Sequence, residues 1–206
     1  MAAPRHALSS APLSLRKEFL RKALHLAATA VPVAYHLGVE RRALVLVLAG
    51  TCALAFLLER LRRGNGRIAA VFNGIFGSLI RPHERRSITG ATWLALSCLV
   101  AVTVLSRNAA IAALWCATVG DPAATIAGRW TTRELTQPAD RDGKTLAGSL
   151  ACAVASFAGV WMLAGYPPLI AGVIAVAATV AESMPVRVDD NVRVAAAAGA
   201  IAQVLA

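Results

Sequence analysis

The sequence predicts an all-α protein that crosses a membrane about seven times. Its 206 residues are 57% hydrophobic and only 16% charged, with a mean hydropathy of +0.61, whereas soluble domains are about half apolar and a quarter charged. The apolar residues, mostly Ala, Leu and Val, form long runs and do not alternate with polar residues as they do in a membrane barrel. We therefore expect one polytopic helical bundle over 16–206, preceded by a flexible segment over 1–15.

Seven apolar runs are the expected membrane-spanning helices. An eighth run, over 68–80, has about 13 residues and is too short to span, so it suits an interfacial or re-entrant element. The last of the seven is also short for a span. The seven expected helices cover 23–39, 43–58, 90–106, 109–128, 146–164, 166–184 and 192–206.

The charged residues predict how the bundle is oriented. With the N-terminus in the cytoplasm, only Arg41, Arg42 and Arg107 of the 21 Lys and Arg residues lie outside, and this asymmetry sets topology. All the acidic residues except Glu40 also fall inside. We expect a cytoplasmic site, a C-terminus on the opposite side and no nucleic-acid partner, because the net charge of +10 lies between apolar runs and not on one soluble face.

The four cysteines give no sign of a disulfide framework or a zinc site. Cys52, Cys98, Cys116 and Cys152 all lie inside apolar runs and form no CxxC pair. We expect them to be small packing residues.

The Gly120-Asp121-Pro122 tripeptide predicts a broken helix. Asp121 would cap a new half-helix that starts at Pro122. A carboxylate inside an apolar run costs about 2.5–3.5 kcal/mol on insertion scales, which favours a metal ligand or substrate base over a simple cap. Arg129 and Lys144 are expected at the same membrane level.

Lys144 and Thr145 open the run over 146–164. A helix start with a nearby Lys suits phosphate, although the GxxxxGK[ST] spacing of a P-loop is absent. The alternative is a lysine that anchors the helix at the membrane surface.

A basic segment before the run over 90–106 is a second candidate for phosphate or headgroup contact. Arg85 and Arg86 precede Thr89 and Thr92 at this helix start. A topology signal explains the arginines equally well, but it leaves Glu84 without a role.

Acidic residues near the C-terminus predict a divalent-cation site. Glu182 and the Asp189-Asp190-Asn191 run lie at the expected level of Asp121, and Mg²⁺ usually takes one or two carboxylates plus phosphate oxygens. The alternatives are that the Asp189-Asp190-Asn191 run only caps the following helix and that the Glu182 side chain extends to the membrane surface.

Taken in order, these segments resemble the CTP-dependent lipid kinase family, which includes dolichol kinase, phytol kinase and the CTP-using diacylglycerol kinase. Phosphatidate cytidylyltransferases look related, but the long acidic signature near their C-terminus is absent here. Thr145 stands where the family more usually has Ser. The residues that carry the resemblance, from Arg16 onward, are Arg21, Lys22, His25, Glu59, Arg60, Glu84, Thr89, Thr92, Asp121, Arg129, Lys144, Thr145, Glu182, Asp189, Asp190 and Asn191.

The resemblance implies transfer of the γ-phosphoryl group of CTP to a lipid alcohol, either a polyprenol such as dolichol, phytol or diacylglycerol. Such transfer depends on positioning and charge neutralisation. Glu182 would orient or deprotonate the lipid hydroxyl. The other implied roles are Mg²⁺ binding by Asp121 with Asp189 or Asp190, phosphate binding by Arg129 and Lys144, and nucleotide steering by Arg85 and Arg86.

A small transporter or scaffolding protein is the alternative from another class. Transporters are often built from two related halves. No internal repeat is visible in this sequence, which favours the enzyme.

Overall fold

The computed structural model describes residues 21–23, 25–64, 66–77, 80, 84, 87–134, 144–186 and 188–206. These residues form helices and connecting turns, with no β-strand among them. The predicted all-α class is therefore confirmed. The expected flexible segment over 1–15 lies outside the described residues.

The helices lie where the apolar runs predicted them. Residues 21–23 and 25–27 are helical and lead to α2, so the first expected span is divided near its start. The short run over 68–80 contains α4. The helices are α2 (Ala30–His36), α3 (Arg41–Arg62), α4 (Arg67–Phe76), α5 (Gly90–Val104), α6 (Arg107–Trp115), α7 (Asp121–Glu134), α8 (Leu146–Met162), α9 (Pro168–Ser183) and α10 (Asp190–Val204).

By length and composition, two helices in the described part of the chain could each cross a membrane. One is Arg41–Arg62, with only 22% of its apolar window buried, and the other is Arg107–Thr132, with 72% buried. Helices α5, α8 and α9 are apolar but shorter, at 15, 17 and 16 residues. At about 1.5 Å per residue, they are shorter than a hydrocarbon core of about 30 Å.

The predicted break at Asp121 is wrong. Helix α6 continues through a π-helical turn, Cys116–Gly120, directly into α7, and Asp121 has helical φ and ψ of −63° and −45°. Pro122 has no N–H and would clash with the carbonyl four residues earlier in a regular α-helix. The wider π-turn accommodates this proline without ending the helix, and such turns are frequent at functional sites.

The helices pack through small residues. Ala109, Ala110, Ala112 and Ala113 of α6 are completely buried, and α6 contacts α2, α5, α8 and α10. A Cβ on Gly159 of α8 would lie 2.0 Å from Nε1 of Trp115, so α6 and α8 could not approach this closely with a larger residue there.

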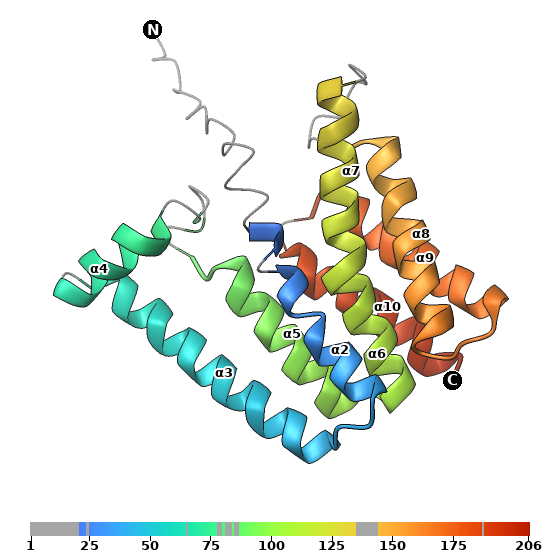
Figure 1. Cartoon of the computed structure of the whole chain (residues 1–206), viewed down its shortest axis with the longest axis horizontal. Helices are drawn as coiled ribbons and strands as arrows, with labels where there is room; N and C mark the ends of the chain where they lie inside the picture. Colours follow the sequence, from blue (N-terminus) through green and yellow to red (C-terminus); the bar gives the residue numbers. More distant parts are fainter. Residues whose placement is uncertain are drawn as a thin grey trace, which may run out of the picture.

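Figure 1 shows the continuous α6–α7 helix running the height of the molecule, with α8 and α9 beside it and α3 on its opposite side. The C-terminal end of α3 and the first turn of α5 lie toward the same end of the bundle, which we call the charged end. The C-terminus lies at the other end.

Candidate functional site

Buried charged side chains gather at the charged end of the bundle. Among the described residues, six Lys, Arg, Asp and Glu side chains are buried, together with the amide of Asn191. They come from segments far apart in the sequence. The six are Lys22, Glu59, Arg62, Glu84, Asp121 and Glu182.

Asp121 is the centre of the first group of contacts. Lys22 donates from Nζ to Oδ2 of Asp121 at 2.6 Å, and Nε2 of His25 lies 3.9 Å from the same oxygen. The His25 ring also bonds the carbonyl of Ala117 at 2.8 Å, within the π-turn. The residues that precede α2 are thereby held against the start of α7.

Lys144, which is partly exposed, and the buried Glu182 form a second ion pair. Lys144 also interacts electrostatically with Asp121, so the two pairs belong to one network of alternating charge. Oε2 of Glu182 lies 3.4 Å from the hydroxyl of Ser183, which in turn lies 3.2 Å from that of Ser149. These contacts bring the predicted site residues Lys144 and Glu182 together, and the shared membrane level of Asp121, Lys144 and Glu182 stays a prediction.

Two glycines allow α7 and α8 to meet beside this network. A Cβ on Gly128 would lie 2.8 Å from Oγ1 of Thr145, and one on Gly148 would lie 2.8 Å from the carbonyl of Ala124. Oγ1 of Thr145 accepts from the amide of Gly148 at 3.0 Å and caps α8. Thr145, a predicted phosphate ligand, therefore uses its oxygen as a cap acceptor and keeps its hydroxyl hydrogen to donate.

Arg21 connects this network with a third group of polar residues. Nη1 of Arg21 donates to both carboxylate oxygens of Glu84 at 3.2 Å, and Oε1 of Glu84 also accepts from the amide of Gly90 at 3.2 Å. Because Lys22 follows Arg21 directly, one short segment contacts Asp121 on one side and Glu84 on the other. The two groups therefore lie within a few side-chain lengths of each other.

Glu59 and Arg62 bind the end of α3 to the start of α5. Arg62 donates to Oε2 of Glu59 at 2.7 Å and to the carbonyls of Glu84 and Ser87 at 2.9 and 2.6 Å. Oε1 of Glu59 accepts from the amide of Thr89 at 2.8 Å and from the hydroxyl of Thr92 at 3.2 Å. These contacts give the Thr92 hydroxyl and the Thr89 backbone amide a structural role, whereas both threonines were predicted to contact phosphate.

The start of α10 meets the start of α5 at Gly90. Nδ2 of Asn191 donates to the carbonyl of Gly90 at 3.1 Å and to Oδ1 of Asp189 at 2.8 Å. A Cβ on Gly90 would lie 3.4 Å from both Oδ2 of Asp189 and Oε1 of Glu84. Burial raises the pKa of the Asp189 carboxyl, and the negative charges of Asp190 and Glu84 add to this rise, while hydrogen bonds from Asn191 oppose it.

The three predicted metal ligands have different surroundings. Asp121 is paired with Lys22, Asp190 with Arg193, and Asp189 caps α10 through its bond to the amide of Asn191. In the described ranges, no group of three or more His, Cys, Asp or Glu residues lies close enough to hold a metal ion. The part of the chain that the structure describes therefore offers no preformed cage of metal ligands.

The remaining predicted site residues are only partly placed. Arg129 is half-buried on α7, about 12 Å beyond Asp121 along the helix axis, and Arg60 is exposed near the end of α3. Arg85 and Arg86 lie outside the described residues. The four cysteines are free and buried, as predicted.

Arg62 is the organising residue that the sequence analysis did not select. It is buried at the centre of the contacts among Glu59, Glu84 and Ser87. Its spacing of three positions from Glu59 places both side chains on one helix face, and this signal could have identified the pair. Arg62 lies in a basic run with Arg60 and Arg63, and such a run is also what a topology signal looks like in a sequence.

Comparison of the chain with protein-family models, with curated proteins and with solved structures finds no match in any of the three.

Proposed function

We propose that this protein is an integral membrane enzyme that transfers the γ-phosphoryl group of CTP to the hydroxyl of a lipid alcohol at the cytoplasmic face. The observation that carries the proposal is the network of Lys22, Asp121, Lys144 and Glu182, in which only Lys144 is partly exposed, within a bundle of mainly apolar helices. Buried ionisable groups in apolar helices are costly and are usually functional.

The distribution of side chains supports a membrane location. Many large apolar residues face outward, for example Leu46 at 73% exposure and Leu169 at 82%, while the interior combines many alanines with large apolar side chains such as Ile111 and with the ion pairs. Soluble proteins hide large apolar side chains, and membrane helices pack through small ones. The shorter helices would then span with local thinning of the bilayer or with flanking residues that reach the surface.

The charged end is the proposed cytoplasmic end. It contains the ion pairs, while Arg41 and Arg107 lie near the starts of α3 and α6 at the other end and donate to backbone carbonyls there. Helix α4 has exposed Val71 and Phe76 beside buried Ala69. This apolar exposure on a ten-residue helix suits a position in the plane of the inner membrane surface.

Lys22 and Lys144 are the proposed ligands of the triphosphate. Each ammonium has three donors, and Asp121 and Glu182 each engage one of them. The carboxylates fix the positions of the two cations, and the positive charge of both would attract phosphate oxygens. Arg129, farther along α7, would extend this positive surface toward the rest of the nucleotide.

Mg²⁺ is proposed as part of the nucleotide substrate. Mg²⁺ binds through one or two carboxylates together with substrate phosphates, and this suits a chain whose described residues form no group of three metal-binding side chains. Asp121 and Asp189 are the carboxylates proposed to face the metal-bound triphosphate. The ion would neutralise charge on the transferred group.

The family resemblance implies that Glu182 orients or deprotonates the lipid hydroxyl. Its bond to Lys144 favours a positioning role for that cation. Phosphoryl transfer passes through a loose transition state in which positioning and charge stabilisation dominate, so a strong base is not required.

A product assay tests the proposal. Membranes that contain the protein are incubated with γ-labelled CTP, Mg²⁺ and a panel of polyprenol, phytol and diacylglycerol. We expect label in the lipid, at least 100-fold less with Lys22→Met or Lys144→Met, and normal labelling with Arg42→Met at the opposite end. A CDP-lipid with released pyrophosphate would identify a cytidylyltransferase, and the absence of any lipid product would contradict both reactions.

A further inference from the structure

Helix α4, at the charged end, exposes both apolar and basic side chains. Figure 1 shows it at the end of α3, on the side of the bundle away from α8 and α9, and it packs on α3. Val71 is 62% exposed and Phe76 43%, and the ring centroids of Phe72 and Phe76 lie 5.1 Å apart. Arg67, the first residue of α4, is also exposed and lies one turn before Val71. One short helix therefore presents a cation beside an apolar surface.

The arginines next to α4 outnumber the acids that could neutralise them. Arg60 is exposed on the last turn of α3, and the sequence over 60–83 has five arginines and no acidic residue. Glu59 lies just before this stretch and pairs with two neighbouring arginines of α3. Within the part of the chain that the structure describes, no ion pair is formed at Arg60 or Arg67. Their charge is therefore available to an anionic surface.

The length of α3 places these cations at the level of lipid headgroups. Arg41 and Arg60 are nineteen positions apart, which is about 29 Å along a helix, and a hydrocarbon core is about 30 Å thick. Leu57 is exposed, and Arg60 follows it by three positions and so lies on the same face. With α3 across the membrane, Arg60 and the start of α4 reach the inner headgroups.

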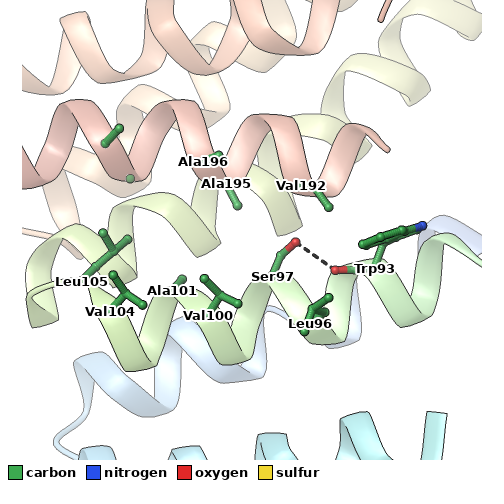
Figure 2. A pocket seen from close by; sticks show the side chains of 12 residues that line it. Trp93, Leu96, Ser97, Val100, Ala101, Val104, Leu105, Val192, Ala195 and Ala196 are labelled. Atoms are coloured by element: carbon green, nitrogen blue, oxygen red, sulfur yellow. Dashed lines mark hydrogen bonds between the residues drawn. The ribbon is translucent and has the colours of Figure 1, made fainter. Parts of the chain in front are cut away.

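These features select one kind of surface for α4. A helix with an apolar face and cations binds in the plane of a membrane, and its binding strengthens with anionic lipid. The cytoplasmic leaflet carries anionic lipids that attract arginines beside membrane spans. The apolar groove between α5 and α10 is different (Figure 2), because none of the described residues that line it is charged. Nothing in that groove selects an occupant.

We propose that α4 binds the anionic phospholipid surface of the inner leaflet. The guanidinium groups of Arg60 and Arg67 contact lipid phosphates, while Val71 and Phe76 enter the layer between the headgroups and the acyl chains. This inference rests on the membrane location in the proposed function and not on the reaction. The lipids concerned are a partner of the protein and not its substrate.

Hydrogen–deuterium exchange tests this surface without relying on catalysis. The purified protein is placed in nanodiscs of phosphatidylcholine alone or of phosphatidylcholine and phosphatidylglycerol in equal parts. We expect the amides of α4 to exchange about tenfold more slowly in the anionic discs, because each arginine near an anionic surface strengthens binding about fivefold. Salt at about 1 M should remove the difference, since it shortens the screening length to about 3 Å. Amides of α5 along the groove in Figure 2 should exchange equally in both discs.

Matched variants complete the experiment. Arg60→Gln combined with Arg67→Gln should make α4 exchange equally fast in both kinds of disc. Arg60→Lys combined with Arg67→Lys should keep most of the difference, because the attraction depends on charge. Arg42→Gln changes an exposed arginine at the opposite end of α3 and should keep the whole difference. Val71→Asp, at an exposed position, should speed the exchange of α4 in both discs.

The outcomes separate this inference from the proposed reaction. Equal exchange of α4 in both discs overturns the inference, whether α4 lies on a neutral membrane or meets a soluble acidic partner. A difference that survives the double Gln variant, or that appears only with two copies of the chain in one disc, overturns it as well. Slower exchange in anionic discs without phosphoryl transfer from CTP keeps the lipid surface and overturns the enzyme. Transfer from CTP with equal exchange keeps the enzyme and overturns the lipid surface.

Discussion

Lys22 and Asp121 are 99 positions apart in the sequence, yet Nζ of Lys22 lies 2.6 Å from Oδ2 of Asp121. Both side chains are buried. Asp121 follows the π-turn that admits Pro122, and Lys22 follows Arg21, which contacts Glu84. One ion pair thus joins the N-terminal segment, the central helix and, through Arg21, the start of α5.

The first prediction concerns this pair. Lys22→Met leaves the Asp121 carboxylate buried without its cation, and the loss of one partner of a buried pair costs about 3–5 kcal/mol. Lys22→Met combined with Asp121→Asn removes both charges and should cost less than the sum of the single changes. Thermal unfolding of the single and double variants in detergent measures this coupling. Additive losses would show that the two residues do not interact.

The second prediction concerns helix packing. Gly159→Ala places a methyl group where Cβ would meet Trp115 at 2.0 Å, and overpacking of this kind costs about 1–3 kcal/mol. Gly172→Ala in α9 is the matched control, since a Cβ there meets nothing within 4 Å. It should stabilise the helix by about 0.5–1 kcal/mol. Equal unfolding temperatures for the two variants would contradict the close contact of α6 and α8.

The sequence revealed the positions of the helices and most of the buried charged residues because both are properties of single segments. A charged residue inside or beside an apolar run, such as Asp121 or Glu182, is visible without knowledge of the fold. Pairings between distant segments, such as Lys22 with Asp121 or Lys144 with Glu182, depend on how the helices pack. The π-turn was missed because Gly-Asp-Pro gives the same signal for a broken helix as for a widened turn.

The third prediction concerns Arg62. Lysine lacks the planar fork that lets Arg62 bond Glu59 and two backbone carbonyls at once. Arg62→Lys should destabilise the protein by about 1.5–3 kcal/mol, the range for hydrogen bonds to charged groups. It should also lower phosphoryl transfer, because the backbone carbonyl of Glu84 would lose the hydrogen bond that Arg62 donates to it.

Arg63→Lys is the matched control for this change. The Arg63 side chain is 43% exposed, and its ion pair with Glu59 is longer, at 3.5 Å. Unfolding temperature and transfer rate should both stay near those of the natural protein. If Arg62→Lys behaved like Arg63→Lys, the hydrogen bonds of Arg62 to Glu59 and to the two backbone carbonyls would not be needed for the site.

The last prediction concerns Mg²⁺. No group of three metal-binding side chains is formed in the described part of the chain. Chelation with EDTA should therefore abolish transfer from CTP while leaving the unfolding temperature unchanged, since an ion that binds with the nucleotide does not stabilise the protein alone. Added Mg²⁺ should restore transfer and, only when CTP is also present, raise the unfolding temperature. A rise with Mg²⁺ alone would instead identify a resident metal site, and Asp121→Asn should then remove that rise if Asp121 is one of its ligands.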